Sequence, residues 1–130
     1  MNNWILLVED DKDIQASLLD LLEMEGYVVR AAYDGRQALD VLHDSEQLPS
    51  LILLDLMMHG MDGREFRKLQ LQDPRLAQIP VVIMSADGEP ANHVADEGLS
   101  GYLRKPADVS DILDTIARHL RPAAASEAAR

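Results

Sequence analysis

The chain has 130 residues, no cysteine, and a formal net charge of -11 from 23 acidic and 12 basic residues. This length favours one domain with its own core, and so acidic a surface argues against direct binding of a nucleic-acid backbone. The sequence has no apolar segment long enough to span a bilayer and no secretory signal, so we expect a cytoplasmic protein without membrane insertion.

The first part of the chain alternates between strand and helix patterns. Trp4–Val8 is an apolar strand that leads into the acidic loop Glu9–Asp11. The helix that follows has one apolar face, made up of Ile14, Leu18, Leu21 and Leu22. Gly26 is a suitable C-terminal stop for this helix. Tyr27–Ala31 is a strand that contains a charge, which suits the edge of a sheet. A turn at Asp34-Gly35 then precedes a short amphipathic helix with Ala38, Leu39 and Leu42.

The strand Leu51–Asp55 is apolar up to its last residue, as expected for a strand covered on both faces. It ends in one carboxylate and a glycine-rich loop, after which Asp62 is a suitable N-cap for a helix carrying Phe66 and Leu69. The next buried strand, Val81–Met84, ends at Ser85.

The remaining elements are less apolar. Residues 87–98 give the weakest helix pattern, and their few large apolar side chains predict mobility. Tyr102–Arg104 is a short, partly charged edge strand that ends at Lys105-Pro106. Val109–Leu120 carries the clearest helical stripe, and the tail after Pro122 has no pattern to bury.

Five strands alternating with helices predict parallel βαβ units, and hence an α/β fold. We expect a doubly wound, five-stranded parallel sheet of order 2-1-3-4-5, which is flavodoxin-like, with helices on both faces. The three most apolar strands are central in this order. One domain is expected over residues 1–121, followed by a short flexible tail over 122–130.

Residues far apart in the sequence become neighbours in this order, because the carboxyl ends of the first, third, fourth and fifth strands lie side by side. They are Glu9, Asp10, Asp55, Ser85 and Lys105. Asp55 is the strongest indication of a site, since an acid that ends a fully apolar strand needs a partner or water.

Each residue taken alone also has a plainer interpretation. Glu9 and Asp10 are equally typical of helix-capping acids after a strand. Ser85 alone is typical of a strand-end hydroxyl, Lys105 of a solvated surface lysine, and Tyr102 of edge packing.

Four segments, in order and each at a strand end, resemble the response regulator receiver domains of two-component signalling. They are Val8–Asp11, Leu54–Gly63, Met84–Ala86 and Gly101–Pro106. The resemblance extends from Trp4 to Leu120. It implies that Asp55 accepts a phosphoryl group from a histidine kinase or a histidine phosphotransfer protein.

The resemblance also implies the companions of Asp55. Glu9, Asp10, Asp55 and the backbone carbonyl of Met57 would bind Mg²⁺, which neutralises charge during phosphoryl transfer. Lys105 and Ser85 would contact phosphoryl oxygens, and Ser85 and Tyr102 would act as switch residues. The surface formed by the fourth helix, fifth strand and fifth helix would then change for a downstream partner, with the chain a monomer or a phosphorylation-dependent homodimer.

Other functions remain open at this stage. The chain is expected to be a signalling module that assists its own phosphorylation and dephosphorylation, and not an enzyme. Alternatives are a phosphorylation-independent interaction domain, or the receiver part of a larger regulator or hybrid kinase. An aspartyl-phosphate phosphatase is disfavoured because Met57 stands where those enzymes carry a second aspartate. A nucleotide-binding Rossmann domain is disfavoured because no glycine-rich fingerprint follows the first strand.

Overall fold

A computed structural model describes residues 4–56, 58, 60–85, 101–104 and 108–119. The predicted weak helix at 87–98 and the tail at 122–130 lie outside these residues, as do Met57 and Lys105.

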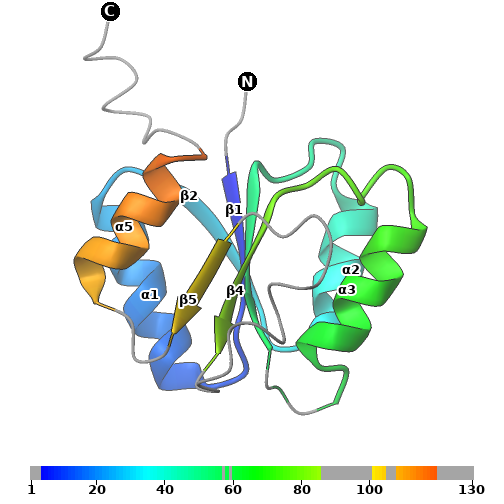
Figure 1. Cartoon of the computed structure of the whole chain (residues 1–130), viewed down its shortest axis with the longest axis horizontal. Helices are drawn as coiled ribbons and strands as arrows, with labels where there is room; N and C mark the ends of the chain where they lie inside the picture. Colours follow the sequence, from blue (N-terminus) through cyan, green and yellow to red (C-terminus); the bar gives the residue numbers. More distant parts are fainter. Residues whose placement is uncertain (1–3, 57, 59, 86–100, 105–107, 120–130) are drawn as a thin grey trace, which may run out of the picture.

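The strands form one parallel sheet in the order β2-β1-β3-β4-β5 (Figure 1), as predicted. Their bounds are Trp4–Val8 for β1, Val28–Ala32 for β2, Leu51–Asp55 for β3, Val81–Ser85 for β4 and Gly101–Arg104 for β5. Every residue of β1, β3 and β4 is buried, whereas β2 mixes buried and exposed positions. The charged strands are therefore at the edges of the sheet.

Among the residues that the structure describes, helices α1 and α5 lie on one face of the sheet, and α2 and α3 on the other (Figure 1). Their bounds are Lys12–Met24 for α1, Gly35–Asp44 for α2, Gly63–Gln72 for α3 and Val109–Ala117 for α5. Successive strand residues point to opposite faces, so each central strand contributes to two cores. Leu6, Ile52 and Ile83 pack with the α2 and α3 face, while Ile5, Leu53 and Val82 pack with the α1 and α5 face.

The predicted apolar face of α1 is partly wrong. Ile14 is 38% exposed, and Gln15 is buried together with Leu18 and Leu22. Residues 15, 18 and 22 follow the i, i+3, i+7 spacing of one helix face, so a glutamine occupies a position towards the sheet. Similarly, Leu69 in α3 is 39% exposed, whereas Phe66 is fully buried.

The helix α3 begins in direct contact with the end of β3. The Gly63 amide donates to the Leu56 carbonyl at 3.1 Å, and Asp62 caps the helix in a reciprocal capping box with Glu65. A Cβ atom on Gly63 would stand 2.7 Å from the Asp55 carbonyl oxygen and 2.8 Å from the Leu56 Cα. Only glycine therefore allows α3 to approach the strand end this closely.

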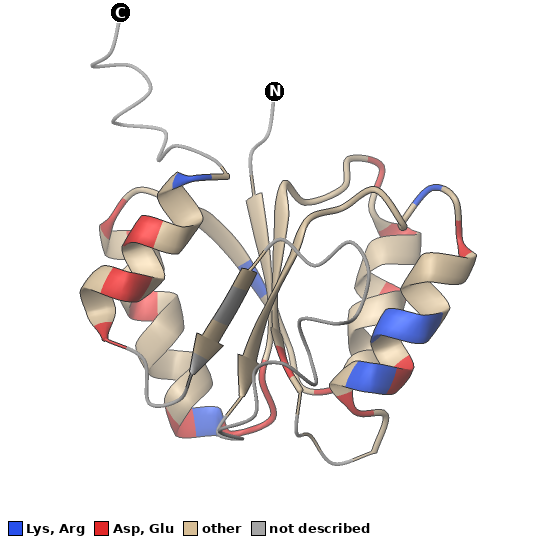
Figure 2. Cartoon of the chain, viewed as in Figure 1, with Lys and Arg blue, Asp and Glu red and all other residues tan. Residues whose placement is uncertain are grey.

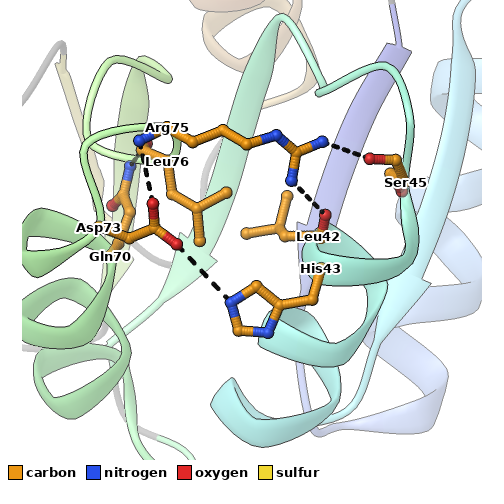
Figure 3. A network of polar contacts seen from close by, with 7 residues as sticks. All are labelled: Leu42, His43, Ser45, Gln70, Asp73, Arg75 and Leu76. Atoms are coloured by element: carbon orange, nitrogen blue, oxygen red, sulfur yellow. Dashed lines mark hydrogen bonds and ion pairs between the residues drawn. The ribbon is translucent and has the colours of Figure 1, made fainter.

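The ends of α2 and α3 are joined by a network of polar contacts (Figure 3). The Arg75 guanidinium donates to the Leu42 carbonyl at 3.4 Å and to the Ser45 carbonyl. Asp73 accepts from the Arg75 amide at 2.9 Å, and its other oxygen lies 3.8 Å from the His43 Nε2 atom. Arg75 thus adds a charged donor to the Leu42 carbonyl, which also accepts from the Ser45 amide at 3.3 Å, and to the carbonyl of the C-cap residue Ser45.

We expect Arg75→Ala to lower the free energy of unfolding by about 1–2 kcal/mol, because two carbonyls lose a charged donor. Urea denaturation measures this change. The matched control is Arg36→Ala, an exposed arginine in the first turn of α2, which should change stability by less than about 0.5 kcal/mol. Equal stability of the two variants would contradict the capping role of Arg75.

Gly63→Ala should lower the free energy of unfolding by about 1–3 kcal/mol, because the new methyl group meets backbone atoms that cannot turn aside. It should also shift the amide resonance of Leu56 in NMR spectra, since the end of β3 or the start of α3 must move. The control is Gly26→Ala, at a glycine with φ of 92° after α1. That variant should be destabilised by backbone strain without any change at Leu56, and a similar Leu56 shift in both variants would contradict the local contact.

Candidate functional site

Three acidic side chains converge at the carboxyl edge of the sheet. Val8 pairs with Leu54, so the register places Glu9, after β1, level with Asp55, the last residue of β3. One carboxylate oxygen each from Glu9, Asp10 and Asp55 lies within 4.8 Å of the other two. Glu9 and Asp55 are 1% and 3% exposed, and Asp10 is half-buried. The structure therefore brings these three predicted site residues together, and Figure 2 shows the acidic loop after β1 at this end of the sheet.

The loop Glu9–Asp11 is held by the start of α1. The Asp11 side chain accepts from the amides of Asp13 at 2.9 Å and Ile14 at 3.1 Å, as an N-cap does. The Asp11 amide donates to the Glu9 Oε2 atom at 3.1 Å. Asp11 is thus the capping acid of this loop.

The backbone of Glu9 is fixed to β2 and to α1. The Glu9 amide donates to the Ala32 carbonyl at 3.0 Å. The Gln15 Nε2 atom donates to the Glu9 carbonyl at 3.0 Å and to the Ala32 carbonyl at 3.2 Å. Gln15 was not among the predicted site residues, although its i, i+3, i+7 spacing with Leu18 and Leu22 places it on the buried face.

The loop after β3 is held by α2 as well as by α3. The Gly35 amide, at the start of α2, donates to the Met61 carbonyl at 2.9 Å. A Cβ atom on Gly35 would lie 2.8 Å from the Met61 Cγ and 2.9 Å from the Phe66 Cβ. Gly60, in the same loop, has a φ of 69°, which suits glycine. The loop that leaves Asp55 is therefore closed by backbone contacts at two helix starts.

The other predicted residues are placed only in part. Asp55 pairs with Met84, so Ser85 lies one residue beyond it on β4, where it is fully buried. Tyr102 lies in β5 opposite Ile83, and its side chain is outside the described residues. Met57 and Lys105 are also outside them.

The donor set fits a small, hard cation. Carboxylate oxygens are the ligands that Mg²⁺ prefers, and oxygens bound to one octahedral Mg²⁺ ion stand about 3–4 Å apart. The spacing of Glu9, Asp10 and Asp55, all within 4.8 Å, is close to that requirement. Three carboxylates this close repel one another, and a cation between them relieves the repulsion.

Within the residues that the structure describes, none of the helices combines the length and the apolar composition that crossing a membrane requires.

Comparison with known proteins identifies the family. The family model described as the response regulator receiver domain matches residues 5–117. The transcriptional regulatory protein CpxR of Escherichia coli K12 is 40% identical over 121 residues, which cover 92% of this chain and 50% of CpxR. Sporulation initiation phosphotransferase F of Bacillus subtilis is 34% identical over 123 residues, covering 92% of this chain and 95% of that protein.

Solved structures agree with the sequence comparisons. The chemotaxis protein CheY4 of Vibrio cholerae superimposes with a TM-score of 0.81 at 27% identity, covering 92% of this chain and all of CheY4. The bacteriophytochrome response regulator RtBRR gives a TM-score of 0.79 at 33% identity, over 90% of this chain and 77% of that one. The chain spans about half the length of CpxR and of several other curated relatives. It belongs to the response regulator receiver domain family of two-component signalling.

Proposed function

We propose that this chain is a phosphorylation-controlled signalling switch, and that Asp55 accepts the phosphoryl group from a histidine kinase or a histidine phosphotransfer protein. Receiver domains are signalling proteins phosphorylated on an aspartate. The observation that carries the proposal for this chain is the buried Asp55 carboxylate within 4.8 Å of Glu9 and Asp10.

In the proposed reaction, an Asp55 carboxylate oxygen attacks the phosphorus atom of a phosphohistidine. The P–O bond to Asp55 forms as the P–N bond breaks, and the imidazole leaves with the electron pair. Mg²⁺, when bound by Glu9, Asp10, Asp55 and the Met57 carbonyl, supplies positive charge to the phosphoryl oxygens. Lys105 adds a second positive charge, and the Ser85 hydroxyl donates to another phosphoryl oxygen.

The burial of the acceptor supports this chemistry. Asp55 is 3% exposed, and the starts of α2 and α3 close the loop that follows it. A site that excludes water strengthens the attraction between the phosphoryl group and its positive partners, and slows hydrolysis of the acyl phosphate.

The output of the switch is proposed to pass through β4 and β5. Ser85 ends β4 fully buried, and Tyr102 lies in the neighbouring strand. We propose that Ser85 moves towards the phosphoryl group, that Tyr102 turns inward, and that the face containing β5 and α5 changes for a downstream protein or a second copy of the chain. The phosphoryl group shifts this equilibrium only as far as it contacts one arrangement better than the other.

The extent of the unit is part of the proposal. We infer a receiver domain over residues 1–121 with residues 122–130 as a tail, which the family match over 5–117 supports. CpxR is by name a transcriptional regulator and is about twice the matched length. The present chain is therefore either a unit that acts through its surface or the receiver part of a larger regulator.

A second candidate function is that of a phosphoryl carrier. Sporulation initiation phosphotransferase F is by name a phosphotransferase, and this chain covers 95% of its length. In that role the phosphoryl group on Asp55 passes on to a histidine of a phosphotransfer protein. Loss of the phosphoryl group from this chain, with its gain by such a protein, is the result that this role predicts.

The phosphorylation proposal is tested by intact-mass analysis after incubation with acetyl phosphate. Wild type should gain one phosphoryl group in the presence of Mg²⁺ and none after chelation. Asp55→Asn should gain none under either condition. Asp40→Asn, which changes an exposed acid of α2 by the same chemistry, should behave as wild type. Modification of Asp55→Asn to the same extent as wild type would show that Asp55 is not the acceptor.

We expect Asp10→Asn to raise the free energy of unfolding by about 1 kcal/mol when divalent cations are absent, because one of three mutually repelling charges is removed. The same variant should gain less stability than wild type from excess Mg²⁺, because the cation loses a charged ligand. Urea denaturation with and without Mg²⁺ measures both changes, with Asp40→Asn as the control. An equal Mg²⁺-dependent gain in Asp10→Asn and wild type would exclude Asp10 as a ligand.

A further inference from the structure

We propose that Gln15 is a positioning residue for the cation site: its side-chain amide holds the backbone of Glu9, and thereby sets where the Glu9 and Asp10 carboxylates stand. The inference rests on the proposed function, because it assigns to Gln15 the support of the acids that bind Mg²⁺.

The contacts of Gln15 are specific in both direction and number. The side chain is 9% exposed and directed from α1 towards the sheet. Its Nε2 atom carries two hydrogens, and it lies 3.0 Å from the Glu9 carbonyl oxygen and 3.2 Å from the Ala32 carbonyl oxygen. Both hydrogens are therefore used. The opposite orientation of the amide would aim its oxygen at two other oxygens, so the contacts fix the orientation.

These bonds extend the pairing of β1 and β2 beyond the point where the strands end. Val8 and Ala32 are the last paired residues. The Glu9 amide still reaches the Ala32 carbonyl, at 3.0 Å, but the Glu9 carbonyl lies beyond the end of β2. Gln15 supplies the donor for this carbonyl, so the peptide groups on both sides of the Glu9 Cα atom are held.

The held peptide groups determine the positions of two of the three acids. The Glu9 carbonyl belongs to the peptide bond that leads into Asp10, so its orientation sets the direction in which the Asp10 side chain leaves the backbone. Repulsion among the three carboxylates, which lie within 4.8 Å of one another, favours rotation of this segment away from Asp55. The two hydrogen bonds of Gln15 oppose that rotation. Removing the hydrogen bonds that orient metal ligands commonly lowers metal affinity by about 10- to 100-fold.

The chain contains a matched control for a purely structural role. Gln70, in α3, is fully buried, and its Nε2 atom also donates to two backbone carbonyls, those of Leu76 at 2.9 Å and Ile79 at 3.2 Å. These carbonyls precede β4, at the opposite end of the sheet from the acids (Figure 1). Replacing either glutamine by methionine removes a buried donor to two carbonyls while keeping the length of the side chain. Gln70→Met also removes the acceptor of a 2.9 Å bond from the buried Arg67, so it should lose at least as much stability as Gln15→Met.

The experiment compares wild type, Gln15→Met and Gln70→Met. The dissociation constant for Mg²⁺ is measured by NMR titration of backbone amides, and stability is measured by urea denaturation. We expect both variants to be less stable than wild type. Only Gln15→Met should bind Mg²⁺ more weakly, by about 10-fold.

Phosphorylation by acetyl phosphate gives a second readout. In Gln15→Met the Mg²⁺ concentration for half-maximal rate should rise by the same factor as the dissociation constant. The rate at saturating Mg²⁺ should remain near that of wild type, because Gln15 acts through the position of the ligands and does not touch the reacting atoms.

The outcomes separate this inference from the proposed function. Wild type that binds no Mg²⁺ would overturn the cation site itself. Wild type that binds Mg²⁺, with equal affinity in Gln15→Met, would overturn the positioning role and leave the site intact. Equal weakening in Gln15→Met and Gln70→Met would also overturn it, because general loss of stability would then be the cause. If Gln15→Met does not fold, Gln15→Asn provides the same test, since its shorter amide cannot reach both carbonyls.

Discussion

Mutual repulsion among the carboxylates of Glu9, Asp10 and Asp55 is the constraint that the rest of the structure accommodates. Two of the three are almost fully buried, where charge is least well solvated. The surrounding backbone must therefore be rigid enough to keep them together. The fully buried strands β1, β3 and β4 supply that rigidity, since each contributes to the cores on both faces of the sheet.

The two sides of the site are held by different devices. On the side of β1, the Asp11 amide binds the Glu9 carboxylate and Gln15 binds the Glu9 carbonyl. On the side of β3, the contacts that the structure describes are made largely by the backbone: Gly63 allows α3 to approach the Asp55 carbonyl, and the Gly35 amide binds the Met61 carbonyl. Hydrogen bonds to the side chain and to the carbonyl of Glu9 thus fix the acidic loop, whereas close backbone packing fixes the loop after Asp55.

Much of this arrangement follows from sequence pattern. The alternation of strands and helices gives the topology, and Arg30 in β2 marks an edge strand. The positions of Glu9, Asp10 and Asp55 follow from the rule that the carboxyl ends of parallel strands share one edge.

The supporting contacts could not be predicted in the same way. Gln15 donates to backbone carbonyls, which every residue possesses, so no residue type in the sequence identifies its partners. Arg75 has the same property, since it binds the Leu42 and Ser45 carbonyls from a loop some thirty residues away. The apolar residue Ile14 beside Gln15 also misleads, because hydrophobicity alone places it on the face that Gln15 occupies.

The asymmetry between the two sides of the site bears on how the proposed switch would work. The β1 side has its hydrogen bonds satisfied within α1 and β2, at Glu9, Asp11 and Gln15. The β4 side presents the buried Ser85, one residue beyond the level of Asp55, and β4 pairs directly with β5. A phosphoryl group on Asp55 would therefore have the acids Glu9 and Asp10 on one side and the Ser85 residue of β4 on the other. In the proposed switch, contacts of the phosphoryl group with Ser85 would act on β4 and on β5, the strand that pairs with it, and would favour the arrangement in which those contacts form.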